Sequence, residues 1–191
     1  MSKRNRRLLI SLIFTLVSLA LLKISNDGYI SGVKTLSSNQ PGYYLVVEVY
    51  DGDTFSVNMD GVVEKIRMIG VDTPETHHPN APVQCFGESA SQYTKKILNG
   101  SKVRLEADPT NSNRDKYQRL LRYVYLQDGR LLNAEIIKDG YGFAYVHFPF
   151  TKMQEFQQFQ DLASESGKGL WSGCEVSDSS GRMQTNDAEG R

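Results

Sequence analysis

The sequence predicts an α+β fold rich in β-barrel structure, with five strands in Greek-key order and about three helices. Two observations support this prediction. Closely spaced runs of β-branched and aromatic residues begin at residue 43, and segments with helical periodicity interrupt and follow them. The chain has 191 residues, enough for one domain with a substantial core and additional segments. Its composition is that of a soluble globular protein.

Short apolar runs define the expected strands. They cover residues 43–50, 54–59, 62–69, 102–107 and 119–126, with a further short extended piece at 143–146. Asp60-Gly61 is a tight hairpin signal between the second and third runs, so the first three strands form a meander.

Helical periodicity is found in three segments. Residues 87–99 and 131–138 each carry an apolar face and end at a glycine-containing turn. The last helix is expected to begin at Thr151 as a cap, with Gln154 reaching back. Its expected inner face comprises Met153, Phe156, Phe159, Leu162 and Ala163. One helix after the third strand and another at the end is the order found in an oligonucleotide-binding (OB) barrel.

The N-terminal residues 1–23 differ in kind from the rest. Basic residues precede Leu8–Leu22, a run without charge that would extend only about 22 Å as a helix, short of a hydrocarbon core of about 30 Å. This layout favours a secretory signal peptide. Because no clear small-residue cleavage site follows the run, an N-terminal membrane anchor stays open, as does a buried globular helix. We therefore expect an exported protein, either secreted or tethered through residues 8–22 to the outer face of the cytoplasmic membrane.

Composition also marks the remaining boundaries. Residues 24–42 are rich in Ser, Gly and Asn, a composition typical of a linker. Residues 43–175 are expected to form the folded domain, and residues 176–191 a disordered tail. The formal charge of zero conceals an asymmetry, since residues 1–23 hold five of the 22 cations and none of the 22 acids. The remainder is acidic, so any nucleic acid must be held by a metal ion and a few placed cations.

Acidic residues gather where two expected strands end. Asp72 and Glu75 follow the third strand, and Asp53 lies in the turn before the second. If these strands are neighbours, three carboxylates come together and repel one another unless a cation such as Ca²⁺ relieves them. With Arg67 and Arg119 the formal charge is minus one, which becomes plus one with a calcium ion and then attracts a phosphodiester. Glu75 can then take a proton from water.

Three motifs together resemble the thermonuclease family, the staphylococcal-nuclease-like domains. They are Asp51-Gly52-Asp53-Thr54, the R-x-x-G-x-D-T-P-E run from Arg67 to Glu75, and Asp115-Lys116-Tyr117-Gln118-Arg119. The resemblance covers roughly residues 43–175 and implies the OB fold.

The resemblance also implies a set of site residues. Asp53, Asp72 and the Thr73 carbonyl are expected to bind calcium, Glu75 to act as general base, and Arg67 and Arg119 to hold the phosphate, while Lys116, Tyr117 and Tyr145 are expected to contact nucleotide. The implied activity is calcium-dependent cleavage of DNA and RNA, preferably single-stranded, with little sequence preference and with 3′-phosphate ends. The protein is expected to act as a monomer.

The chain departs from the family pattern at two positions. Gln118 stands where the family often has Gly, and His147 where it often has a second tyrosine. The first change is expected to alter loop geometry and the second to affect nucleotide contacts, whereas neither touches the catalytic set.

Other assignments of the same residues stay open. A non-catalytic nucleic-acid- or protein-binding module could use the same barrel, although it would not need the five catalytic and metal-binding side chains. A membrane-tethered calcium-binding structural protein explains the acids but leaves both arginines without a role. His77 and His78 are adjacent in a loop and lack a third ligand, so a metal site there is disfavoured.

Cys85 and Cys174 are the only cysteines. In an exported chain such a pair is expected to form a disulfide, which would close a loop of about 90 residues and contribute up to about 4.5 kcal/mol. Two unrelated buried thiols are the alternative. Thiol catalysis is disfavoured, because neither cysteine has a base at a recognisable spacing.

Overall fold

The structure is a computed structural model that describes residues 42–76 and 82–188. The predicted signal or anchor segment, nearly all of the linker, and His77 and His78 lie outside these residues. Within the described ranges, no helix is both long enough and apolar enough to cross a membrane.

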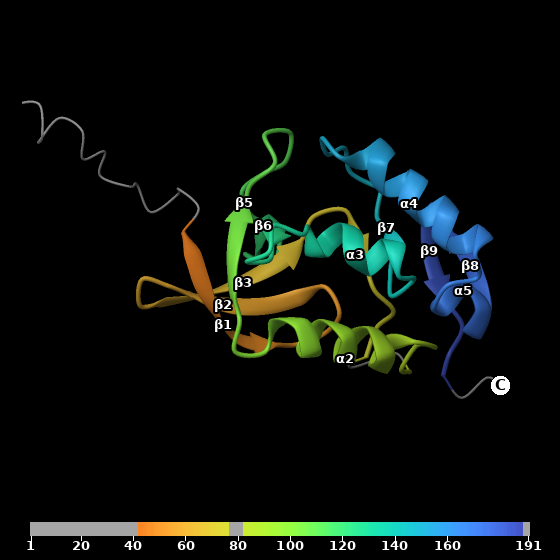
Figure 1. The fold of residues 1–191 in the computed structure, drawn as a ribbon. Coiled ribbons are helices and arrows are strands. Elements are labelled where there is room, and N and C mark those ends of the chain that lie inside the picture. Colours follow the sequence, from red (N-terminus) through yellow and green to blue (C-terminus); the bar gives the residue numbers. More distant parts are fainter. Residues whose placement is uncertain (1–41, 77–81, 189–191) are drawn as a thin grey trace, which may run out of the picture. The chain divides into compact units, whose positions relative to one another are not determined.

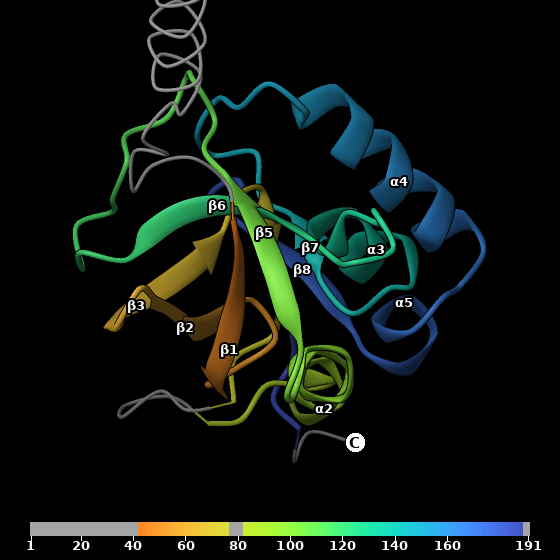
Figure 2. The ribbon, with the colours of Figure 1, turned by 60° about the vertical axis from the view of Figure 1, so that its left-hand side comes forward.

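Five strands close into a barrel, as the sequence predicts. They are β1 (Tyr43–Val49), β2 (Thr54–Met59), β3 (Val62–Met68), β5 (Lys102–Glu106) and β6 (Leu120–Tyr125). Their order around the barrel is β1-β2-β3-β6-β5, with β3 and β6 parallel and the other pairs antiparallel. Figure 2 shows the ring that they form. The α+β class and the OB barrel are therefore confirmed.

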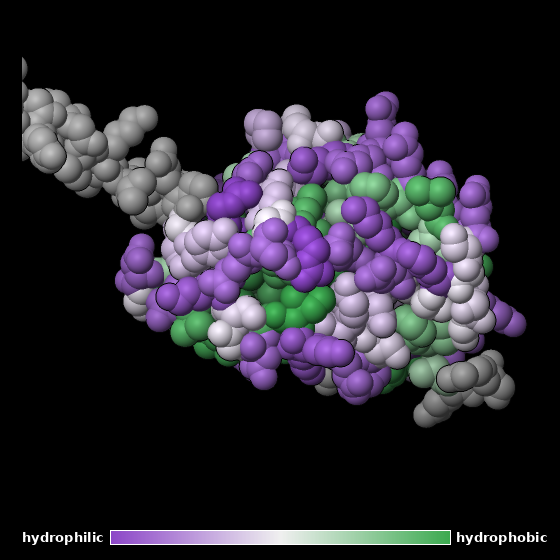
Figure 3. Space-filling view, viewed as in Figure 1, coloured by the Kyte–Doolittle hydropathy of each residue, from purple (hydrophilic) through white to green (hydrophobic). Residues whose placement is uncertain are grey.

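Alternation along the strands builds the core. In β1, Tyr44 and Val46 are buried whereas Leu45 and Val47 are exposed, as the period of two requires. In β2, Phe55 and Val57 are completely buried. Polar side chains cover most of the face in Figure 3, with smaller apolar patches between them.

Four helices are described: α2 (Gly87–Leu98), α3 (Leu132–Lys138), α4 (Met153–Glu165) and the short α5 (Leu170–Gly173). The first three lie where periodicity predicts them, and α5 was not anticipated. On α4, Phe156 and Ala163 are buried as expected, but Leu162 is 61% exposed, so its assignment to the inner face was wrong. The expected Thr151 cap was also wrong, because α4 has Lys152 at its N-cap and the Thr151 hydroxyl bonds to Asp108 instead.

Two very short strands complete the region around the acidic residues. β4 (Val71–Asp72) pairs antiparallel with β7 (Phe143–Ala144), with Asp72 opposite Phe143. This pairing attaches the end of the third barrel strand to the segment that precedes α4. It thereby fixes the position of Asp72.

The expectation of a disordered tail from residue 176 was wrong for residues 176–185. They form an antiparallel hairpin of β8 (Val176–Ser179) and β9 (Arg182–Thr185). In Figure 1 this hairpin lies with α4 and α5 at the end of the molecule away from the β2–β3 turn. Polar composition suggested disorder, but long-range contacts hold this segment.

Those contacts converge on Cys85. A disulfide joins Cys85 to Cys174, which directly precedes the hairpin segment, in agreement with the sequence-based expectation. The Cys85 amide donates to the Asn186 carbonyl (2.7 Å), the Thr185 hydroxyl donates to the Cys85 carbonyl (2.8 Å), and the Ala188 amide donates to the Val83 carbonyl (2.8 Å). The hairpin is thus attached on both sides to the segment before α2.

Asp108 joins three parts of the fold. Its carboxylate accepts hydrogen bonds from the Tyr123 hydroxyl on β6 (2.6 Å), the Thr151 amide before α4 (2.7 Å) and the Thr110 hydroxyl (2.6 Å). Burial alone would raise the pKa of Asp108, but the hydrogen bonds from Thr110, Thr151 and Tyr123 outweigh it and hold the pKa well below its usual range.

We predict that Asp108→Ala lowers the free energy of unfolding by about 1–3 kcal/mol at pH 7. The reason is that the hydrogen-bond donors of Thr110, Tyr123 and Thr151 lose their acceptor. A carboxylate whose pKa is depressed on folding stabilises the fold above its unfolded pKa of about 3.9, and this contribution is lost as the pH falls below that value. The difference between wild type and variant, measured by urea unfolding, should therefore shrink between pH 5 and pH 3. The matched control is Asp161→Ala, at an exposed position on α4. A pH-independent difference would contradict the assignment.

Candidate active site

Arg67 brings together the two carboxylates expected to bind metal. Its Nη1 lies 2.7 Å from Asp53 Oδ2, and its Nη2 lies 2.9 Å from Asp72 Oδ1. Nη1 also donates to the Val71 carbonyl (2.7 Å). The turn before β2 supplies Asp53, β3 supplies Arg67 and β4 supplies Asp72, so the three groups meet at one end of the barrel strands.

This cluster is buried and charged. The Arg67 side chain is only 14% exposed and each carboxylate 7%. Burial acts to lower the pKa of Arg67, but the charges of Asp53 and Asp72 outweigh it and raise that pKa. Burial also raises the pKa of Asp72, against the opposing effects of the Arg182 hydrogen bond and the Arg67 charge. Charged side chains of both signs are thus held together in a poorly solvated site.

Thr73 connects the two acidic loops. Its amide donates to Asp53 Oδ2 at 3.0 Å, and its hydroxyl lies 3.3 Å from the same oxygen. The opposing residue, Gly52, leaves no room for a side chain, because a Cβ there would lie 2.7 Å from Thr73 Cγ2. Glycine in the Asp-Gly-Asp turn therefore permits the close approach that places Thr73 against Asp53.

Asp51 is a fourth acid near the site that the sequence analysis did not single out. Its Oδ1 accepts the Asp53 amide (3.0 Å). Burial, followed by the charge of Asp53, raises the pKa of Asp51 to about 7. Asp51 belongs to the Asp-Gly-Asp-Thr motif of the sequence analysis, but only Asp53 of that motif was given a role there.

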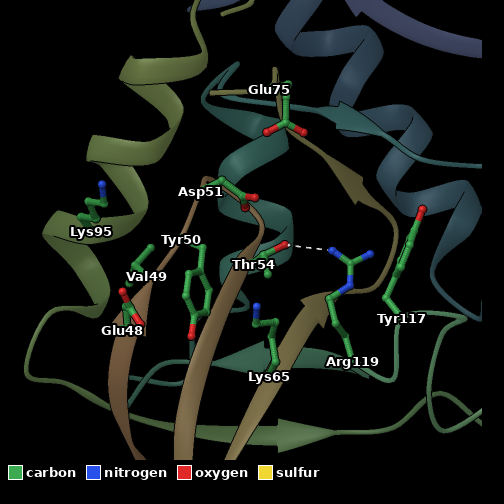
Figure 4. A pocket seen from close by; sticks show the side chains of 10 residues that line it. All are labelled: Glu48, Val49, Tyr50, Asp51, Thr54, Lys65, Glu75, Lys95, Tyr117 and Arg119. Carbon is green, nitrogen blue, oxygen red and sulfur yellow. Dashed lines mark hydrogen bonds between the residues drawn. The ribbon is translucent and has the colours of Figure 1, made fainter. Parts of the chain in front are cut away.

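A cleft of about 690 Å³ opens beside the buried cluster. Its lining residues, shown in Figure 4, are Glu48, Val49, Tyr50, Asp51, Thr54, Lys65, Glu75, Lys95, Tyr117 and Arg119. The carboxylate of Glu75 and the guanidinium of Arg119 are both directed into this cleft (Figure 4). Lys65 and Lys95 add cations that the sequence analysis missed, since no local motif identifies them.

The expected crowding of three carboxylates was wrong in detail. Asp53 and Asp72 meet through Arg67, whereas Glu75 lines the cleft. In the part of the chain that the structure describes, no three or more His, Cys, Asp or Glu side chains are arranged to hold a metal ion. The oxygen donors suited to a hard cation are the two aspartates, which the Thr73 carbonyl could supplement.

Gln84 positions Glu75 through the backbone. The Glu75 amide donates to Gln84 Oε1 (2.8 Å), and the Gln84 amide donates to the Glu75 carbonyl (2.9 Å). Gly87 also lies against this loop, since a Cβ there would be 2.7 Å from the Glu75 carbonyl oxygen. Gln84 adjoins Cys85, so the disulfide-bonded segment supports the Glu75 loop.

Arg119 is held at the opposite side of the cleft. Its Nη2 lies 2.7 Å from Asp115 Oδ2, and its Nη1 donates to the Thr54 hydroxyl at 3.4 Å. Gln118, the departure from the family pattern, has φ of 66°, a left-handed conformation that glycine adopts more easily. The backbone of Gln118 is therefore strained, although the loop still forms the Asp115–Arg119 pair.

Of the three residues expected to contact nucleotide, Tyr117 lines the cleft, whereas Lys116 and Tyr145 do not. Tyr117 is 67% exposed. The Lys116 ammonium lies 4.9 Å from the centre of the Tyr117 ring. Tyr145 stacks with His147 at 6.0 Å between ring centroids, and neither residue lines the cleft. Roles for Lys116 and Tyr145 stay predictions.

A closed OB barrel with a carboxylate–arginine cluster beside an open polar cleft defines an oligonucleotide-binding type of architecture. Comparison with known proteins specifies the family. The family model described as staphylococcal nuclease homologue matches residues 65–173, more than half of the chain. The chain therefore belongs to the staphylococcal nuclease family.

Three relatives illustrate the similarity. A thermonuclease of Staphylococcus hyicus is 44% identical over 138 residues, covering 72% of this chain and 80% of the relative. A thermonuclease of Staphylococcus intermedius is 43% identical over 129 residues, covering 67% and 75%. Endonuclease YncB of Bacillus subtilis is 41% identical over 124 residues, covering 64% and 58%.

We predict that Gly52→Ala lowers the free energy of unfolding by about 1–3 kcal/mol, because the new methyl group must displace Thr73 from Asp53. Urea unfolding in the presence of chelator measures this loss. Gly42→Ala is the matched control, since a Cβ at Gly42 would meet its nearest atom at 3.9 Å. Equal stabilities of the two variants would show that the close approach of Gly52 and Thr73 is unimportant.

Proposed function

We propose that this member of the staphylococcal nuclease family is a calcium-dependent endonuclease that hydrolyses phosphodiester bonds of DNA and RNA with little sequence preference. The observation that carries the proposal is the placement of Glu75 and Arg119 in one cleft beside the buried aspartates. That arrangement combines a base, a phosphate-binding cation and oxygen donors for a metal. The relatives named thermonuclease and endonuclease support the same reaction class.

Asp53, Asp72 and the Thr73 carbonyl are the groups that would hold Ca²⁺. Carboxylate and carbonyl oxygens are its preferred ligands, and water can complete the coordination. When bound, Ca²⁺ would supply positive charge to stabilise the charge that develops on the phosphate.

Glu75 is the proposed general base. It lines the cleft, and its backbone is fixed by two hydrogen bonds with Gln84, one to the Gln84 side-chain oxygen and one from the Gln84 amide. From this position its carboxylate would take a proton from the water that attacks phosphorus. Cleavage that leaves the phosphate on the 3′ side, as expected for the family, requires departure of the 5′ oxygen.

The two arginines have different surroundings. Arg67 uses both terminal nitrogens on the buried aspartates, whereas Arg119 lines the cleft. We therefore propose that Arg119 makes the principal contact with nonbridging phosphate oxygens, since a planar guanidinium can bind two oxygens at once. Arg67 would act mainly by holding the metal-binding carboxylates in place.

The cleft suits a single strand. The exposed ring of Tyr117 can stack on a base of any identity, and Lys65 and Lys95 can contact the backbone. A non-catalytic binding module would need these surfaces but not Glu75 and the aspartate pair, which favours catalysis. A disulfide suits an exported protein, and we propose secretion or membrane tethering of a monomer.

We predict that Glu75→Gln lowers the single-turnover rate on denatured DNA by about 10²- to 10⁴-fold, the range expected for loss of a general base. Calcium affinity, measured separately by calorimetry, should be nearly unchanged, because Asp53 and Asp72 remain. Excess EDTA should stop the wild-type reaction.

Glu155→Gln, at an exposed position on α4, is the matched control and should cleave at the wild-type rate. Wild-type rates in Glu75→Gln would end the general-base proposal. Full activity of the wild type in EDTA would end the calcium proposal.

A further inference from the structure

The C-terminal hairpin reaches the proposed metal site through Arg182. Arg182 Nε donates to Asp72 Oδ2 at 2.7 Å, and its Nη2 donates to Asp72 Oδ1 at 3.1 Å. Arg182 is the first residue of β9, and it lies 110 residues from Asp72 in sequence. No sequence motif connects the two residues, and the contact exists only because the hairpin folds.

Both oxygens of Asp72 are engaged by arginine. Oδ1 accepts from Arg67 Nη2 and from Arg182 Nη2, and Oδ2 accepts from Arg182 Nε. A carboxylate has about four lone-pair positions, and three are occupied here. A calcium ion on Asp72 would have to displace at least part of this pairing and would also stand close to a positive guanidinium.

Arg67 and Arg182 differ in how easily they can be displaced from Asp72. Arg67 is almost fully enclosed and is also bonded to Asp53 and the Val71 carbonyl. The Arg182 side chain is 58% exposed, and its guanidinium is paired with Asp72. Arg182 can therefore leave into solvent, whereas displacement of Arg67 would break the buried cluster.

The chain holds Arg182 near its partner at high effective concentration. The Cys85–Cys174 disulfide precedes the hairpin, and the hydrogen bonds of Thr185, Asn186 and Ala188 follow it. A tethered group competes intramolecularly, so the competition does not weaken on dilution of the protein.

We propose that Arg182 competes with the divalent cation for Asp72, so that the C-terminal hairpin sets the affinity of the metal site. This inference rests on the calcium dependence proposed above. In the metal-free protein Arg182 neutralises Asp72. On binding of calcium the guanidinium moves off Asp72 while the hairpin stays attached through its disulfide.

Calorimetric titration of the oxidised protein with CaCl₂, in chelator-stripped buffer without nucleic acid, tests the proposal. Arg182→Gln should bind calcium about three- to tenfold more tightly, because the Arg182–Asp72 ion pair no longer has to break and a nearby like charge is removed. Arg182→Lys should show a smaller gain, since it retains the charge but not the planar fork. Arg104→Gln, which removes an arginine paired with Glu106 on β5, is the matched control and should bind like wild type.

Equal or weaker calcium affinity in Arg182→Gln would overturn the competition and leave the proposed nuclease function intact. If neither wild type nor the variants bound calcium, the calcium dependence itself would fail, and the role of Arg182 with it. The two failures are therefore distinguishable in one set of titrations.

Discussion

The ion pairs of Arg67 with Asp53 and Asp72 are the interactions on which the site depends. Three charges are taken out of water at the end of the barrel, and their desolvation is costly unless the geometry is good. Each charge comes from a different part of the chain: a turn, a barrel strand and the two-residue strand β4. Arg67 therefore holds the two aspartates together and compensates their charge.

A chain of polar contacts extends from this cluster in both directions. On one side Asp53 accepts the Thr54 hydroxyl, which in turn accepts Arg119 at the edge of the cleft. On the other side Asp72 accepts Arg182 from the C-terminal hairpin. The proposed phosphate-binding residue and the proposed metal competitor are thus connected through the same buried carboxylates, and a change at one end can alter the other.

The barrel was predictable from sequence because its strands are long enough to show alternation and the Asp60-Gly61 turn joins β2 to β3. The two-residue strands β4 and β7 are too short for periodicity to reveal. The β8–β9 hairpin looked disordered because its polar composition carries no sign of the disulfide and backbone hydrogen bonds that hold it. Composition indicates how much apolar surface a segment can bury by itself. It does not show which distant segments stabilise it.

The site was predictable to a similar extent. Motif spacing identified Asp53, Arg67 and Asp72, which the fold brings together, and Glu75 and Arg119, which line the cleft. Spacing could not show that Arg67 pairs with both aspartates while Glu75 lines the cleft, because side-chain pairing depends on the register of β2 and β3. Lys65, Lys95 and Arg182 were missed since each reaches the site only through long-range packing.

The dependence of the site on Arg67 is tested most directly by the free energy of unfolding of Arg67→Ala, measured by urea titration in EDTA and again in saturating calcium. We expect a loss of about 3–5 kcal/mol in EDTA, because two buried carboxylates lose their shared partner. We also expect calcium to stabilise the variant more than the wild type, since the metal would supply the missing positive charge. Wild-type stability of Arg67→Ala in EDTA, or an equal effect of calcium on both proteins, would show that the site does not depend on these ion pairs.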